Sequence, residues 1–353
     1  MSRIAPWVHR QTLHLLSQPG HAWLLQGPTG LGQASLALSM AQAWLCEQPT
    51  AEGLGCGVCP SCHGIAVHTH PDLMVLMPEE DMLAQDLPLD EKALREIEEK
   101  KRKPSKEIRI EAMRQAVEFS QRTSSRNHGK VVVIYPAERM NAITSNALLK
   151  TLEEPPGSVR FILASEAAHS LLPTIRSRCL THTMVWPTHD EALQWLMQQE
   201  IHIDGKPPKT FTLPRADAEV LLQAAGGRPD DALRLAQEGI QAHEWLHFPT
   251  AARAGQTSVF AAFTPTKVID VLQKICHDAL AIKAGGKPRY FPADVLPKAP
   301  ELASWLMLTR WSKSLQQERM SSNHSYKADV FIDDLIARAS MALAVPATAR
   351  RQR

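Results

Sequence analysis

The stretch that decides the fold covers residues 25–35 and reads LQGPTGLGQAS. It follows the pattern G-x-x-x-x-G-K-[ST], in which backbone N–H groups surround phosphates, a lysine reaches the β- and γ-phosphates and a hydroxyl holds Mg²⁺. Gly27, Gly30 and Gly32 keep the loop, but Gln33 stands in place of the lysine and Ala34 in place of the serine or threonine. The sequence therefore predicts a phosphate-binding loop that lacks the side chains needed for nucleotide hydrolysis.

Around this loop, short apolar runs alternate with longer helical patterns, which is typical of a parallel sheet covered by helices. The run 131–134 is continuous and β-branched, as fully buried parallel strands tend to be. We expect strands at residues 22–25, 73–77, 131–135, 161–164 and 179–185, and helices at 34–44, 110–122 and 141–154. Residues 1–186 should thus form an α/β module of the P-loop NTPase type.

The pattern changes at Pro187, and 353 residues leave room for two or three domains. Thr188 and Glu191 have the spacing of a helix capping box, and the chain then looks helical with breaks at Pro and Gly. One break is expected around residues 248–265. We predict a small helical lid over residues 187–247, an all-helical domain over 248–346 and a disordered tail over 347–353.

The overall composition argues against a membrane protein and against a strongly basic protein. The formal net charge is +2, so no general basic field indicates nucleic acid. No apolar run approaches the roughly 18 residues that a membrane span needs, and the N-terminus shows no signal-peptide core. We expect a cytoplasmic protein without membrane contact.

Cysteines gather in a short region after the first helix of the module. Cys56, Cys59 and Cys62 form two overlapping C-x-x-C steps, and Cys46 lies ten residues earlier. Four thiolates satisfy a closed tetrahedral structural zinc site. The region 46–70 also holds three histidines, so a Cys₃His set is the alternative, and free thiols are a third reading; the histidines are His63, His68 and His70.

A nucleotide-hydrolysing module also needs an acidic residue at a strand end to hold Mg²⁺, usually with a second carboxylate beside it. Tyr135 and Pro136 occupy those places, and Glu138 comes two residues late, as expected of a surface or helix-start residue. The lysine, the hydroxyl and both carboxylates are thus missing together. This argues against metal–nucleotide chemistry in this chain.

Two features allow more than one reading. Arg176 and Arg178 precede the last strand, and the residues alone favour arginines at a helix C-terminus over an arginine finger acting on a neighbour. The charged stretch 79–106 mixes both signs, which favours a solvated surface helix or mobile loop over a DNA-binding arm. We assign that stretch no role.

Residues 146–156 (NALLKTLEEPP) and 177–179 (SRC) resemble the bacterial clamp-loader branch of the AAA+ proteins, and the resemblance covers about residues 1–240. The cysteine-rich insertion is also shared with that branch. The resemblance implies that the four cysteines hold zinc and that Arg178 reaches the ATP site of an adjoining motor subunit. Ser165 matches a sensor position, and Asp230 stands where active members carry a sensor arginine.

The resemblance further implies partners and a task. The C-terminal helices would join the collar of a hetero-pentamer that opens a ring-shaped sliding clamp and places it on primed DNA. We therefore favour a non-hydrolysing structural subunit that activates a neighbour in trans.

Two alternatives remain. An ATP-hydrolysing, gamma/tau-like motor would need the neutral amide of Gln33 to stabilise charge as a lysine does. A zinc-dependent nucleic-acid-binding module is disfavoured by the near-neutral charge and the 5% of aromatic residues. The glycines of the loop and the helix after it are compatible with weak nucleotide binding.

Overall fold

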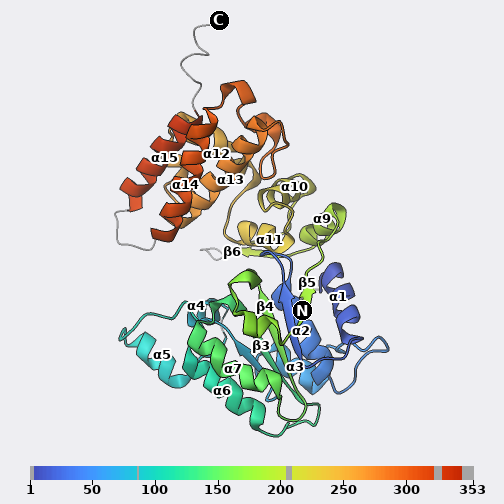
Figure 1. Ribbon diagram of the computed structural model, residues 1–353. Coiled ribbons are helices and arrows are strands. Elements are labelled where there is room, and N and C mark those ends of the chain that lie inside the picture. Colours follow the sequence, from blue (N-terminus) through green and yellow to red (C-terminus); the bar gives the residue numbers. More distant parts are fainter. Residues whose placement is uncertain (1–3, 86, 204–208, 322–327, 344–353) are drawn as a thin grey trace, which may run out of the picture. The chain divides into compact units, whose positions relative to one another are not determined.

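The computed structural model describes residues 4–85, 87–203, 209–321 and 328–343, and the chain divides into two compact units, 1–187 and 188–353 (Figure 1). Each unit has its own packed interior. The tail predicted for residues 347–353 lies outside the described residues.

The first unit is built on a parallel sheet of five strands in the order β2-β3-β4-β1-β5. The strands are β1 (Ala22–Gln26), β2 (Leu73–Leu76), β3 (Lys130–Ile134), β4 (Val159–Ser165) and β5 (Leu180–Thr183). All five lie where the sequence predicts strands. Because every pair is parallel, the carboxyl ends meet at one edge of the sheet, and β1 delivers its loop to that edge between β4 and β5.

Eight helices accompany this sheet among the described residues (Figure 1). They are α1 (Pro6–Leu16), α2 (Gln33–Leu45), α3 (Pro60–Ala66), α4 (Glu79–Ala84), α5 (Glu91–Glu98), α6 (Ile110–Gln121), α7 (Ala142–Glu153) and α8 (Pro173–Arg176). The helices predicted at residues 34–44, 110–122 and 141–154 are confirmed as α2, α6 and α7. The structure adds two 3₁₀ turns, η1 (Ala137–Arg139) and η2 (Ala168–Ser170).

The centre of the sheet is covered on both faces, which explains its uninterrupted apolar strands β1, β3 and β4. Alternate residues of a strand point to opposite faces. Val132 and its register partner Phe161 face a cluster completed by Met113 of α6 and Leu148 of α7, and all four are fully buried. Every residue of β3 is buried, including Lys130, so both faces of this strand are covered.

The second unit is mainly helical but also contains a small hairpin. Its strands β6 (Ile201–Ile203) and β7 (Lys209–Phe211) are antiparallel, where the sequence predicts only helices. Three-residue strands are too short to give a periodic signal. The helices are α9 (His189–Met197), α10 (Arg215–Ala224), α11 (Pro229–Gln237), α12 (Ala242–Ala254), α13 (Pro265–Lys283), α14 (Trp305–Ser321) and α15 (Ala328–Leu343).

The break that the sequence predicts around residues 248–265 is present from Gly255 to Thr264, but helix α12 extends into its first part. Pro249 lies inside it, and the helix ends at Gly255, whose φ of 72° is left-handed. An internal proline normally breaks or kinks a helix. Here Phe248 is buried and stacks on Phe260 at 5.2 Å between ring centroids, so aromatic packing holds the helix through the proline.

One continuous hydrophobic cluster runs through this unit, from Ala192 of α9 to Leu343 of α15. The division into a lid and a separate helical domain therefore stays a prediction. Among the described residues, no helix combines the length and apolar character that a membrane span requires.

Candidate functional site

The glycine-rich loop lies at the carboxyl edge of the sheet, between β1 and α2. Gly30 and Gly32 have φ values of 76° and 91°, a left-handed conformation that side chains other than glycine rarely adopt. Gly32 is the N-cap of α2. A tight loop with left-handed glycines is therefore present at the predicted place, between a strand and the start of a helix.

Gln33 fills the place that a lysine would use. Its side-chain amide donates to the carbonyl oxygens of Gly27 at 2.9 Å and Pro28 at 2.6 Å, and the residue is only 2% exposed. An amide cannot carry the positive charge that a triphosphate needs. The residue instead ties the two ends of the loop together.

Other contacts occupy the rest of the loop. The N–H of Gly27 donates to the carbonyl of Ser165 at 3.2 Å, and Trp7 Nε1 donates to the carbonyl of Leu31 at 2.9 Å. A Cβ placed on Gly27 would lie 2.8 Å from Cβ of the buried Met184. The loop is thus packed against its own module on several sides.

The ends of β3 and β4 form a closed polar network beside this loop. The hydroxyl of Ser165 donates to Glu138 Oε2 at 2.8 Å, and the N–H of Glu166 donates to Glu138 Oε1 at 3.1 Å. The Tyr135 hydroxyl donates to Glu166 Oε1 at 2.7 Å. Glu138 lies in the 3₁₀ turn η1, close to the helix start expected of it, and its carboxylate is bound by Ser165, a pairing that the sequence did not indicate.

The four predicted cysteine ligands come together around one point. Their sulfur atoms all lie within 4.8 Å of one another. Three of the Sγ–Sγ distances are 3.6 Å (Cys46–Cys62), 3.8 Å (Cys46–Cys59) and 3.9 Å (Cys56–Cys62). A tetrahedron with Zn–S bonds of about 2.3 Å has S–S edges of about 3.8 Å. The cluster therefore has the dimensions of a tetrathiolate metal site.

Backbone N–H groups support the sulfur atoms. The amides of Cys56, Cys59 and Cys62 point at the sulfurs of Cys46, Cys56 and Cys59, at 3.3, 3.3 and 3.4 Å. Burial opposes ionisation of Cys59, but N–H groups of Cys62 and Glu47 outweigh it and lower its pKa to about 6. Burial raises the pKa of Cys62 to about 12. The cluster therefore differs greatly between a state with four uncharged thiols and a state with four thiolates. A bound cation favours the thiolate state.

The histidines considered as alternative ligands take other positions. His70 is buried, with Nε2 3.1 Å from Ser61 Oγ and Nδ1 accepting from the N–H of Asp72. Both of its ring nitrogens are therefore engaged. His63 and His68 are exposed, and the cluster found among the described residues contains the four cysteines alone.

Arg178 follows the short helix α8 and lies at the surface of the first unit. Its Nη1 donates to the carbonyl of Thr174 at 2.9 Å, and its Nη2 forms an ion pair with Glu153, the last residue of α7. The neighbouring Cys179 has a pKa raised to about 12 by burial, so it is a packing residue with an unreactive thiol. Sequence reasoning did not identify Glu153, although an acidic residue ending a helix is an unusual choice.

The charged stretch 79–106 folds over the edge strand β2. Arg102 binds Glu79 through two nitrogens, at 2.5 and 2.9 Å, and Glu96 through Nε at 2.8 Å. Within the stretch, α5 is a helix without buried residues. This confirms the solvated surface helix, one of the two forms expected for the stretch. The ion pair between Glu79 and Arg102 joins the start of the stretch to a position near its end.

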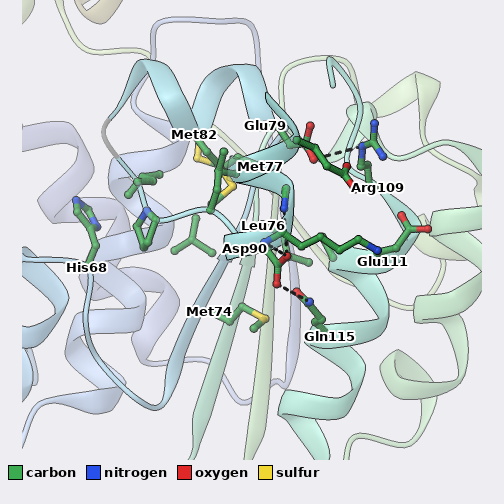
Figure 2. A pocket seen from close by; sticks show the side chains of 18 of the residues that line it. His68, Met74, Leu76, Met77, Glu79, Met82, Asp90, Arg109, Glu111 and Gln115 are labelled. Carbon is green, nitrogen blue, oxygen red and sulfur yellow. Dashed lines mark hydrogen bonds and ion pairs between the residues drawn. The ribbon is translucent and has the colours of Figure 1, made fainter. Parts of the chain in front are cut away.

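Between this stretch and β2 lies a cavity of about 480 Å³. Figure 2 shows Met77 and Met82 close together, with Met74 lower in the view beside Gln115, whose side-chain amide donates to Asp90 at 3.5 Å. No motif in the sequence signals this cavity, because it is formed by segments that meet only in the folded chain.

The position at which the resemblance places a sensor arginine lies in the second unit. Asp230 lies in the first turn of α11, and burial together with Asp231 raises its pKa to about 6. Arg228 is held by Asp231, with 2.7 Å between Nε and Oδ2. Asp230 is acidic and Arg228 is paired with Asp231, so neither residue offers an unpaired positive charge at the start of α11.

Comparisons with known proteins identify relatives of this chain. A family model described as "DNA polymerase III, delta subunit" matches residues 13–185. The "DNA polymerase III subunit delta'" of Pseudomonas aeruginosa is 36% identical over 243 residues, which cover 68% of this chain and 64% of that protein. The protein of the same name in Haemophilus influenzae is 30% identical over 246 residues, which cover 68% and 63%. These matches span slightly less than two thirds of either relative.

Among solved structures, a DNA polymerase III gamma subunit-related protein of Thermotoga maritima aligns with 95% of this chain and 99% of its own, with a TM-score of 0.48 and 13% identity. The parallel sheet with β4 between β1 and β3, the loop after β1 and the helical unit that follows define a P-loop module of the AAA+ class. Within that class, the chain belongs to the family of DNA polymerase III delta-prime subunits.

Proposed function

We propose that this chain is a non-hydrolysing subunit of a clamp loader. It would assemble with gamma/tau and delta subunits into a hetero-pentamer, through which it meets the sliding clamp and primer–template DNA in the cytoplasm. The observation that carries the proposal is the side chain of Gln33, which bonds to two carbonyl groups of its own loop.

A hydrolysing site must stabilise charge that develops on the γ-phosphate, and a lysine and Mg²⁺ normally do so. Here Gln33 is neutral, Ala34 has no hydroxyl, and the strand end carries Tyr135 and Pro136. The carboxylate of Glu138, four residues past the end of β3, accepts a hydrogen bond from the hydroxyl of Ser165. These contacts support a loop whose role is structural rather than hydrolytic.

In this proposal the active group is Arg178, which acts on ATP held by a neighbouring subunit. An arginine supplied in trans neutralises charge in the transition state and contributes about 10³–10⁵ in rate. Support comes from its position on the surface of the first unit, where 30% of the side chain is exposed.

The cysteine cluster would hold one structural zinc ion. Cys46, Cys56, Cys59 and Cys62 supply four sulfur ligands at tetrahedral spacing, so zinc would close the segment without an open position for catalysis. Zinc bound in this way stabilises local folding.

The function is tested with a reconstituted loader in which all ATP sites are disabled except the one that adjoins this chain. Arg178→Ala should lower the rate of ATP hydrolysis at that site by about 10³-fold without loss of assembly. Arg176→Ala, an exposed arginine two residues away, is the matched control and should hydrolyse ATP at the unaltered rate.

The isolated chain gives the second half of the test. It should turn over no ATP above background. Turnover in the isolated chain that disappears in Gln33→Ala, or an unchanged loader rate in Arg178→Ala, would contradict the proposal.

A further inference from the structure

The guanidinium of Arg178 is held at two points by the ends of two helices. Its Nη1 donates to the carbonyl of Thr174 in α8, and Nη2 contacts the carboxylate of Glu153 at the end of α7. Ser177 Oγ lies 3.5 Å from Nη1, at the limit of a hydrogen bond. Twenty-five residues separate Arg178 from Glu153, so this contact depends on how α7 and α8 pack.

Local preference does not explain the acidic side chain at residue 153. The carboxyl end of a helix carries partial negative charge, which disfavours a carboxylate and favours a cation such as Lys150 in the same turn. Glu153 therefore sits where helix stability alone would not place it. Its ion pair with Arg178 offsets this unfavourable position.

The two contacts leave a defined part of the guanidinium available. Arginine has five N–H donors in a planar fork. Two are used by Thr174 and Glu153, and Nε is inaccessible to solvent and has no hydrogen-bond partner among the described residues. Nη1 also approaches Ser177 Oγ, so the N–H that remains is the second one on Nη2. A guanidinium N–H donates a charge-assisted hydrogen bond to a phosphate oxygen.

We propose that Glu153 is a positioning residue, whose carboxylate fixes Arg178 so that the remaining N–H of Nη2 faces a phosphate on the neighbouring subunit. The inference rests on the proposed function of Arg178. A long side chain that is already held in one geometry loses less conformational freedom when it meets its ligand. Removal of the carboxylate should therefore lower the rate of hydrolysis rather than the affinity for ATP.

The test uses the same reconstituted loader, with its one working site next to this chain. Glu153→Ala should lower kcat roughly fivefold, the effect of one exposed ion pair, with KM for ATP unchanged. Glu153→Gln should retain part of the rate because its carbonyl oxygen still accepts from Nη2. Glu154→Ala is the matched control, since it removes the next, exposed carboxylate, and it should leave kcat unchanged.

A double variant separates positioning from a general loss of structure. Glu153→Ala combined with Arg178→Ala should be no slower than Arg178→Ala alone, because Glu153 acts only through the arginine. Thermal unfolding and assembly of each variant show whether the fold is intact. A further loss in the double variant, or an equal loss in Glu154→Ala, would overturn the inference.

The outcomes also distinguish this inference from the proposed function. If Arg178→Ala has no effect, the arginine finger itself is wrong. If Arg178→Ala is slow but Glu153→Ala hydrolyses ATP at the original rate, the finger stands and the positioning role is wrong. A faster Glu153→Ala variant would mean that the carboxylate restrains the arginine, and it would overturn the inference in the opposite direction.

Discussion

Loss of one cysteine ligand should remove zinc from the cluster and destabilise the first unit. The three measured Sγ–Sγ distances lie between 3.6 and 3.9 Å, close to the edge of about 3.8 Å for tetrahedral zinc, so binding requires little rearrangement. Cys62 is the most deeply buried ligand and leads from α3 into the cluster. Cys62→Ser should therefore leave an incomplete site in a segment with few other buried residues.

The size of the effect follows from the linkage between binding and folding. A ligand present at about 100 times its dissociation constant stabilises the folded state by about 2.7 kcal/mol. For a unit of this size, each kcal/mol shifts Tm by about 2–4 °C. Metal removal should thus lower the Tm of the first unit by roughly 5–11 °C. The sheet core lies in a separate cluster of buried residues, so the strands should persist.

Metal analysis and thermal unfolding measure these effects together. The wild-type chain should contain one zinc ion, Cys62→Ser should contain none, and a chelator should bring the wild-type Tm down to that of the variant. Cys179→Ser is the control, because this thiol lies in the same unit but outside the cluster. A folded wild-type preparation without zinc, or full zinc content in Cys62→Ser, would refute the reasoning.

Two further predictions concern buried carboxylates. Asp278 is fully buried and accepts the backbone N–H groups of residues 289–291 at 2.7–2.9 Å, so Asp278→Asn should cost about 3 kcal/mol in urea unfolding, and the exposed Asp294→Asn almost nothing. Burial alone raises the pKa of Glu79, but hydrogen bonds from Arg102 and Ser105 outweigh it and hold that pKa below 4.5. A lowered pKa adds stability above the unfolded value, so Glu79→Gln should be less stable by about 1–2 kcal/mol at pH 7 and equal to wild type below the folded pKa. A constant difference between pH 7 and pH 3 would contradict the second prediction.

The three inner strands of the first unit, β1, β3 and β4, could be predicted because each is a short apolar run that is almost entirely buried. The run that became β3 shows the reason, since every one of its residues is buried. The second unit was less predictable. The strands of its hairpin are three residues long, and Pro249 stands in a helix that aromatic packing stabilises from outside. Local patterns carry no information about such packing.

The candidate site divides in the same way. Cysteine spacing was sufficient to predict that four sulfur atoms gather at one point, because the four cysteines lie within 17 consecutive residues. The network of Glu138 with Ser165, the cavity beside β2 and the contact of Arg178 with Glu153 join segments that are far apart in the chain. Their residue types gave no signal of these partners.

What the sequence alone determined is which chemical groups the phosphate loop contains. A glutamine, an alanine, a tyrosine and a proline cannot supply the charge, hydroxyl and carboxylates of an ATPase, whatever the fold. Only the tertiary structure decided which contacts the side chains make. Gln33 donates to two carbonyl groups of its own loop, and Glu153 forms an ion pair with Arg178. Side-chain identity fixes the chemistry that is available, whereas the packing of helices and strands fixes which groups come within hydrogen-bonding distance.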